Sequence, residues 1–174
     1  MALHNTVVKS GDAVGVYADE YFQRAYFRNN LFLGGPGGFY NGYSSGPGLV
    51  ASLGTAGEGL DFDYNAYGTR ADRFLGQLGT RLFTSLEDLR RKTSEKHAVL
   101  SRWDDFAAPV AYPGDPFPAL PVADLRLRSG ATAQDAALRI PNINDNFEGA
   151  EPDIGAYEGS QPLPLYGPRV TLPP

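Results

Sequence analysis

The stretch RNNLFLGG, residues 28–35, decides how this chain folds. It places two asparagines directly before a short apolar run and ends that run on two glycines. A similar device, HNTVV, occurs at residues 4–8, and DYNAY carries a further asparagine at Asn65. Asparagine tolerates left-handed backbone geometry at a tight corner, and identical amides can hydrogen-bond from strand to strand. We therefore interpret these asparagines as equivalent corners of stacked strands.

The spacing of the asparagines predicts a repeating β structure. Asn30 follows Asn5 by 25 residues and precedes Asn65 by 35 residues. The longer interval holds a glycine-rich insertion, residues 34–48, whose composition predicts a loop. Short runs of Val, Phe, Tyr and Leu between Gly, Asn and Asp indicate strands. A period in the twenties with short strands predicts a β-solenoid, in which each coil buries side chains against the next.

The composition excludes several classes of function. The 174 residues suit about one domain, and the hydrophobic content of 42% is enough for a buried core. The net charge of −5 argues against a nucleic-acid partner, because such binding needs clustered Lys and Arg. The absence of cysteine excludes disulfides and thiolate catalysis. No apolar run approaches the roughly 18 residues of a membrane span, and the first residues lack the pattern of a signal peptide.

We expect three segments along the chain. They are residues 1–82 for the coils with the loop at 34–48, residues 83–100 for a surface helix, and residues 101–174 for an extended C-terminal cap and tail. The helix is indicated by a capping box of Thr84 and Glu87 and by a thin apolar stripe. The last segment is punctuated by proline, which suits a chain that wraps over a scaffold.

Residues 123–160 carry a more specific pattern, ADLRLRSGATAQDAALRIPNINDNFEGAEPDIGAYEGS. Together with NNLF, DYNAYG and WDDF upstream, this pattern resembles the C-terminal region of right-handed parallel β-helix proteins of the pectate-lyase-like type. The family's closing pDiGAyE is present intact at residues 152–158. The segment SGATAQDAAL departs from the family by lacking a Ser-Pro pair and a glycine after Asp135. The resemblance covers nearly the whole chain and is strongest over its last third.

The resemblance implies an all-β fold, the end of a right-handed parallel β-helix with one surface helix and a wrapped C-terminal cap. Family members stack many coils before this region, whereas few repeats occur here. We therefore expect either a piece of a larger protein or a chain that docks on further β-helix coils or forms a homo-oligomer. The implied location is extracellular or periplasmic.

The implied function is that of the C-terminal portion of a polysaccharide-active or polysaccharide-binding protein, non-catalytic by itself. A polysaccharide lyase or glycoside hydrolase is the expected enzyme class for a larger parent. No catalytic residue is carried over from the family. Among possible bases, Lys9, Arg24 and Arg28 are explained equally well as solvated residues of a strand face.

Candidate binding residues follow from the side-chain types. Four aromatic residues offer apolar faces with polar edges, on which the rings of an acidic polysaccharide can stack. They are Tyr40, Tyr43, Trp103 and Tyr112. Trp103 is interpreted equally well as a packing anchor for the C-terminal segment.

Calcium is the one cofactor that the sequence suggests. Asn144, Asp145 and Asp153 lie in an Asn/Asp-rich loop and carry oxygen ligands of the kind that calcium takes. Turns stabilised by Asn and Asp side chains explain the same loop without an ion. Asp61 and Asp63 alternate along a strand and share one face, which suits either paired carboxylates or solvated polar residues.

A structural role is the alternative hypothesis. A solenoid piece with exposed coil ends can self-assemble or dock on a partner, as in a fibre, an adhesin or a surface component. The sequence leaves this choice, the identity of the sugar and the oligomeric state open.

Overall fold

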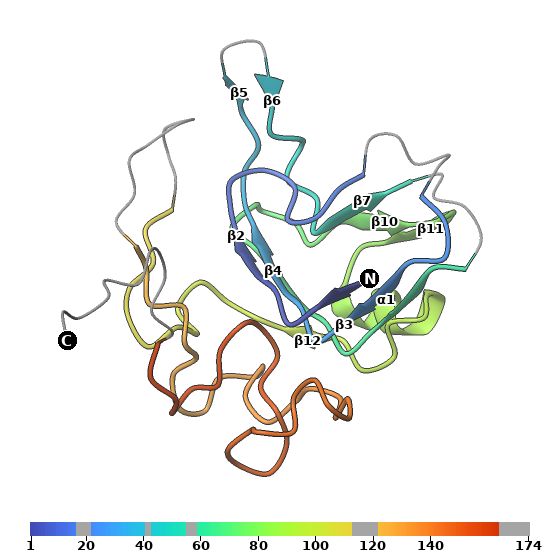
Figure 1. The fold of residues 1–174 in the computed structure, drawn as a ribbon. Coiled ribbons are helices and arrows are strands. Elements are labelled where there is room, and N and C mark those ends of the chain that lie inside the picture. The colour runs from blue at the N-terminus through green and yellow to red at the C-terminus, as the bar shows by residue number, and fades with distance from the viewer. Residues whose placement is uncertain (17–21, 41–42, 55–58, 113–121, 164–174) are drawn as a thin grey trace, which may run out of the picture.

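The computed structural model describes residues 1–16, 22–40, 43–54, 59–112 and 122–163 (Figure 1). Short strands dominate the first hundred residues, and a helix lies between the last two of these strands. The elements are β1 (Ala2–Leu3), β2 (Thr6–Val8), β3 (Tyr26–Arg28), β4 (Leu31–Gly34), β5 (Phe39–Tyr40), β6 (Tyr43–Ser44), β7 (Ala51–Leu53), β8 (Asp61–Asp63), β9 (Ala66–Thr69), β10 (Gly76–Leu78), β11 (Arg81–Phe83), α1 (Leu86–Lys92) and β12 (Val99–Leu100).

Two parallel sheets meet at the asparagine corners. One has the strand order β1-β3-β8 and the other the order β12-β9-β4-β2. Ala2 pairs with Phe27 and Thr6 with Leu31, so one register offset holds on both sides of the corner. The chain therefore turns at the same place in each layer.

The remaining strands form a further sheet and a hairpin. Strands β7 and β10 pair in parallel, and β11 then reverses direction to pair with β10 in an antiparallel manner. Strands β5 and β6 form an antiparallel hairpin that projects from the body (Figure 1). The expected loop at residues 34–48 therefore contains a hairpin.

The asparagine ladder expected from the sequence is confirmed. The Asn5 amide donates to Asn30 Oδ1 at 2.8 Å, and the Asn30 amide donates to Asn65 Oδ1 at 2.8 Å. The left-handed conformation belongs to the residue before each ladder asparagine: φ is 49° at His4, 60° at Asn29 and 56° at Tyr64. The left-handed turn and the ladder hydrogen bonds therefore belong to two adjacent residues, whereas the sequence predicted one asparagine for both.

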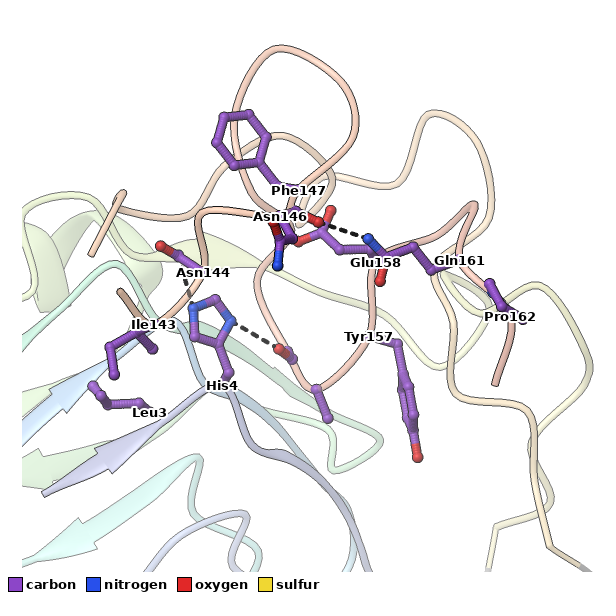
Figure 2. A pocket seen from close by; sticks show the side chains of 12 residues that line it. Leu3, His4, Ile143, Asn144, Asn146, Phe147, Tyr157, Glu158, Gln161 and Pro162 are labelled. Atoms are coloured by element: carbon purple, nitrogen blue, oxygen red, sulfur yellow. Dashed lines mark hydrogen bonds between the residues drawn. The ribbon is translucent and has the colours of Figure 1, made fainter. Parts of the chain in front are cut away.

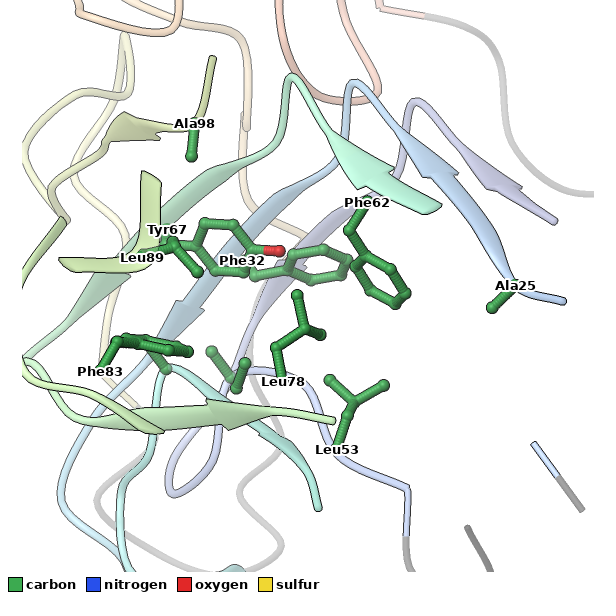
Figure 3. Close-up of a cluster of buried hydrophobic side chains, with 12 residues drawn as sticks. Ala25, Phe32, Leu53, Phe62, Tyr67, Leu78, Phe83, Leu89 and Ala98 are labelled. Atoms are coloured by element: carbon green, nitrogen blue, oxygen red, sulfur yellow. The ribbon is translucent and has the colours of Figure 1, made fainter. Parts of the chain in front are cut away.

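Two hydrophobic clusters hold the layers together. The first fills the space between the sheets, where Phe32 packs beside Tyr67 (Figure 3). Phe27, which packs against this cluster, stacks on Phe62 with ring centroids 4.3 Å apart. The second joins β4 and β9 to the C-terminal segment through buried residues such as Ile154. Because apolar burial is the main favourable term in folding, this second cluster fixes the C-terminal segment to the sheets.

The described residues of the C-terminal segment have little regular structure but specific anchors. The side chain of Asn29 bonds to both backbone groups of Leu138, at 2.8 Å each. Gly155 N donates to Asn29 O at 2.8 Å, and its φ of 120° favours glycine. The first asparagine of RNNLFLGG therefore binds the C-terminal segment, and the second belongs to the ladder.

The predicted fold, the end of a right-handed parallel β-helix with a wrapped C-terminal cap, is wrong. The described residues form three small sheets of short, mostly parallel strands and a separate hairpin, with no closed solenoid. Strands of two to four residues leave most of each layer in irregular backbone, and β11 turns back against β10. The asparagine spacing identified strand neighbours, but spacing alone does not close a coil.

The helix is shorter than the expected residues 83–100, and its N-cap lies one residue later than expected. It spans Leu86–Lys92, and its N-cap is Ser85, whose Oγ accepts a hydrogen bond from Asp88 N at 3.1 Å. Thr84, the expected cap, donates instead to the Asp88 carboxylate. Within the described part of the chain, no helix is long and apolar enough to cross a bilayer.

Candidate functional site

The candidate site lies where β4, β9 and β12 end. Arg70 directly follows β9, and Trp103 follows β12. Both residues bond to the carbonyl oxygen of Gly34 at the end of β4, Arg70 through its backbone N and Trp103 through its indole Nε1, at 3.1 Å each. One carbonyl thus brings together two residues that lie 33 positions apart in the sequence.

Tyr112 completes an aromatic and arginine cluster. Its ring lies 5.0 Å from the Trp103 ring at an interplanar angle of 58°. The guanidinium of Arg70 lies 5.3 Å from the centroid of Trp103 and 5.4 Å from that of Tyr112, within the range of cation–π attraction. Arg70 is exposed, so its positive charge is accessible to solvent while its guanidinium lies over the two aromatic rings.

The second glycine of RNNLFLGG makes room for this cluster. A Cβ atom on Gly35 would lie 2.4 Å from Cε2 of Tyr112, which is too close for two carbon atoms. The Tyr112 hydroxyl also donates to Pro36 O at 2.8 Å. The Tyr112 ring therefore packs directly against the backbone of Gly35, in the turn that follows β4.

A pocket of about 540 Å³ opens beside the cluster. Its lining combines one cationic and one anionic side chain with apolar residues. The lining residues are Arg70, Trp103, Asp104, Phe106, Ala107, Ala108, Pro109 and Val110. Asp105, directly after the exposed Asp104, is buried and accepts hydrogen bonds from Ser101 Oγ and Arg102 N, which fixes the loop that carries Trp103.

The structure brings together two of the four aromatic residues proposed for sugar contact, Trp103 and Tyr112. Tyr40 and Tyr43 are directly opposite each other in the β5–β6 hairpin, but their side chains lie outside what the structure describes. Trp103 also packs against the second hydrophobic cluster, so the packing interpretation holds as well.

Sequence reasoning missed Arg70. The one signal that points to it is its position 35 residues after Gly35, the offset that relates β4 to β9. When β4 and β9 are aligned at that offset, Arg70 lies opposite Gly35.

The suggested calcium residues are used within their own loop. The oxygens of Asn144, Asp145 and Asp153 accept hydrogen bonds from backbone N–H groups, as in Asn- and Asp-stabilised turns. The donors are Ile140 for Asn144, Asn142 for Asp145, and Asp135 and Gly159 for Asp153. Burial raises the pKa of Asp153. The described residues contain no group of three or more His, Asp or Glu side chains placed to hold a metal ion.

Asp61 and Asp63 do not act as a pair. Asp61 forms an ion pair with Arg28 at 2.6 Å, and Asp63 bonds to His97 Nδ1 at 2.8 Å. Tyr64 stacks on the His97 ring at 4.2 Å. Each carboxylate therefore has its own basic partner.

A further pocket, of about 380 Å³, lies between β1 and the C-terminal segment (Figure 2). His4 stands at its wall, with Nδ1 bonded to Gly155 O at 3.1 Å and Nε2 contacted by the amides of Asn29 and Asn144. Because the amides donate to Nε2, the ring is neutral with its proton on Nδ1, and burial lowers its pKa. Both ring nitrogens serve the structure and are not available to a ligand.

Comparison with protein-family models, with curated proteins and with solved structures gives no match to this chain. The candidate site is therefore defined by its own geometry: an exposed arginine over two aromatic rings beside a pocket of mixed polarity.

Proposed function

We propose that this chain binds an acidic polysaccharide at the pocket beside Arg70, Trp103 and Tyr112. The observation that carries the proposal is the Arg70 guanidinium held over the two aromatic rings at the pocket's edge. An aromatic face packs against the C–H groups of a sugar ring, and a guanidinium binds a carboxylate in two-pronged fashion. An acidic sugar presents both features on one ring.

Binding fits the pocket better than catalysis. Among the lining residues, Asp104 is the one carboxylate and Arg70 the one cation, whereas hydrolysis of a glycosidic bond needs two carboxyl groups. The resemblance of residues 123–160 to the closing region of pectate-lyase-like proteins supports the same class of ligand. An extracellular or periplasmic location belongs to this proposal.

Isothermal titration calorimetry with an oligomer of galacturonic acid tests the proposal. The wild-type chain should bind it, and Arg70→Gln should weaken binding by roughly tenfold or more, because a charge-assisted hydrogen bond contributes about 1.5–3 kcal/mol. Arg81→Gln is the matched control, since Arg81 is also exposed but lies on β11, outside the pocket lining. Equal affinity of the two variants, or equal binding of a neutral glucose oligomer, would count against the proposal.

A second candidate function is docking on another polypeptide. It is favoured by the exposed edges of β1 and β2, each of which is the last strand in its sheet. Unpaired strand edges are ready sites for pairing with a further chain or with a second copy. Sedimentation velocity over a range of concentrations tests the homo-oligomer: a mass that rises with concentration supports it, and a constant monomer mass rejects it.

A further inference from the structure

In the asparagine ladder, each asparagine donates hydrogen bonds to the next one along the chain. The first member, Asn5, therefore receives none from the ladder. Asn30 Oδ1 accepts two hydrogen bonds from Asn5, one from the backbone N at 3.1 Å and one from the side-chain amide at 2.8 Å. Asn65 Oδ1 accepts the same pair from Asn30, at 3.0 and 2.8 Å. Among the described residues, Asn5 Oδ1 has no donor, and Asn5 is exposed.

The opposite end of the ladder is closed. The Asn65 amide donates to Glu95 Oε1 at 2.7 Å, and Tyr67 OH donates to the same oxygen at 2.5 Å. Glu95 is fully buried, and its Oε1 accepts both of these hydrogen bonds. The ladder can therefore be extended at Asn5 alone.

The strands beside Asn5 are open on the same side. Asn5 O accepts from Leu31 N, and Lys9 N donates to Leu33 O, so these residues of the first layer face β4. Backbone groups alternate in direction along a strand, which turns those of Thr6 and Val8 toward the outer edge. β1 is likewise the outermost strand of its sheet. The open acceptor thus lies between two open strand edges.

We propose that the edge formed by β1, Asn5 and β2 binds an extended polypeptide segment that runs parallel to it and presents an asparagine to Asn5 Oδ1. The existing layers define the required partner: a strand, a left-handed residue, an asparagine and a second strand. This inference rests on the docking function proposed above and specifies the partner that docks. It is independent of polysaccharide binding.

A second copy of this chain does not meet the requirement. The Asn5 amide already donates to Asn30 Oδ1 and to Leu3 O, so both of its hydrogens are used. The far end of the ladder in a second copy is the Glu95 carboxyl, which is fully buried and therefore out of reach of Asn5 Oδ1. The missing donors must therefore come from a segment whose asparagine is not yet paired.

A synthetic peptide with the sequence of residues 2–10, ALHNTVVKS, is the probe, because it has the required pattern and a free asparagine amide. Labelled with a fluorophore, it is titrated with the full chain and followed by fluorescence polarisation. The comparison peptide, ALHATVVKS, lacks only the carboxamide group of the asparagine. We expect saturable binding of the first peptide and roughly tenfold weaker binding of the second.

The protein variants Val8→Pro and Val8→Ala locate the site. Proline removes the outward N–H of Val8 and leaves the bonds to β4 in place, whereas alanine keeps that N–H and removes two side-chain carbons. Val8→Pro should abolish binding and Val8→Ala should preserve it. In the wild-type chain, the backbone amide signals of Thr6 and Val8 should shift in NMR spectra on peptide addition, which tests the site even where the proline variant does not fold.

The outcomes separate the two proposals. Equal binding of both peptides would overturn the role of Asn5 Oδ1 and leave docking at the edge intact. Binding without a shift at Thr6 and Val8 would place the peptide elsewhere and overturn the proposed site. An absence of any peptide binding to the wild-type chain would overturn this inference, whereas homo-oligomer formation is decided separately by sedimentation velocity.

Discussion

Asn30 is the residue on which the fold depends most. It is fully buried, and its side chain links the layer of Asn5 to the layer of Asn65. A buried polar group that loses its partner costs about 1–3 kcal/mol, and the loss of Asn30 affects a partner on each side.

We predict that Asn30→Ala lowers the free energy of unfolding by about 2–4 kcal/mol. Asn5→Ala, at the exposed end of the ladder, should lower it by about 1 kcal/mol or less, because water can replace the lost bonds. Urea denaturation followed by circular dichroism measures both. An equal decrease in the free energy of unfolding in the two variants would show that the buried ladder bonds of Asn30 do not stabilise the fold more than the exposed ones of Asn5.

The pKa of Glu95 predicts a pH dependence of stability. Burial raises this pKa from 4.5 to about 7, against the lowering effect of the hydrogen bonds from Tyr67 and Asn65, and the charge of Asp63 raises it further. A raised pKa in the folded state means that folding favours the protonated form. The corresponding stability is present below pH 4.5 and is lost as the pH rises through 7, on the order of 3 kcal/mol in full.

Glu95→Gln should remove this dependence, because the amide keeps an acceptor oxygen and does not ionise. Between pH 5 and pH 8, the free energy of unfolding should fall more steeply in the wild type than in the variant, as measured by urea titration at each pH. Glu87→Gln is the control, since Glu87 is exposed on α1. Parallel curves for the wild type and Glu95→Gln would mean that Glu95 does not titrate in this range.

Much of the residue-scale account was predictable and some was not. The asparagines at 5, 30 and 65 were recognisable because an identical amide recurs before an apolar run. Glu95 was not recognisable as the end of the ladder, because it follows a helix rather than an asparagine corner and a lone glutamate usually lies on the surface. The left-handed residues were also missed: His4 and Tyr64 carry no local signal for that conformation.

At the scale of elements, the ends of β4, β9 and β12 create the candidate site. Their parallel pairing places the turn at Gly35 beside Arg70 and brings Trp103 to the same edge. The register of these strands was predictable from the asparagines, because the offset at a corner continues into the strands. The closure of a coil was not, since it depends on how irregular segments between strands pack.

Gly35→Ala should weaken polysaccharide binding while the fold is retained. The added Cβ would clash with the Tyr112 ring, which must then shift relative to Arg70 and Trp103. Calorimetry with the galacturonic acid oligomer should show a loss of affinity, with circular dichroism unchanged. Gly79→Ala provides a comparison, because nothing lies within 4 Å of a Cβ at that position, although its φ of 57° adds local strain. An unchanged affinity in Gly35→Ala would remove Tyr112 from the site.

At the scale of the molecule, the C-terminal segment and the sheets form one unit through the second hydrophobic cluster. Ile154, within the intact PDIGAYE sequence, is fully buried there, and Gly155 beside it bonds to Asn29. The sequence indicated that this segment wraps over a scaffold. It could not indicate which groups anchor it, because Asn29 and Leu138 lie 109 residues apart.

Ile154→Ala should lower the free energy of unfolding by about 2–5 kcal/mol, the usual cost of such a core truncation. Because Trp103 packs against this cluster, unfolding followed by tryptophan emission and by circular dichroism should shift together. A shift in the tryptophan signal alone would show that the C-terminal segment unfolds separately from the sheets.

The most direct test of the proposed function uses Trp103, the only tryptophan in the chain. Because its ring lines the candidate pocket, a ligand bound there should change its emission. Titration with a galacturonic acid oligomer should give a saturable change in emission that a neutral glucose oligomer does not produce and that Arg70→Gln weakens. Calorimetric binding with no change in Trp103 emission, or no binding at all, would contradict the assignment of polysaccharide binding to this pocket.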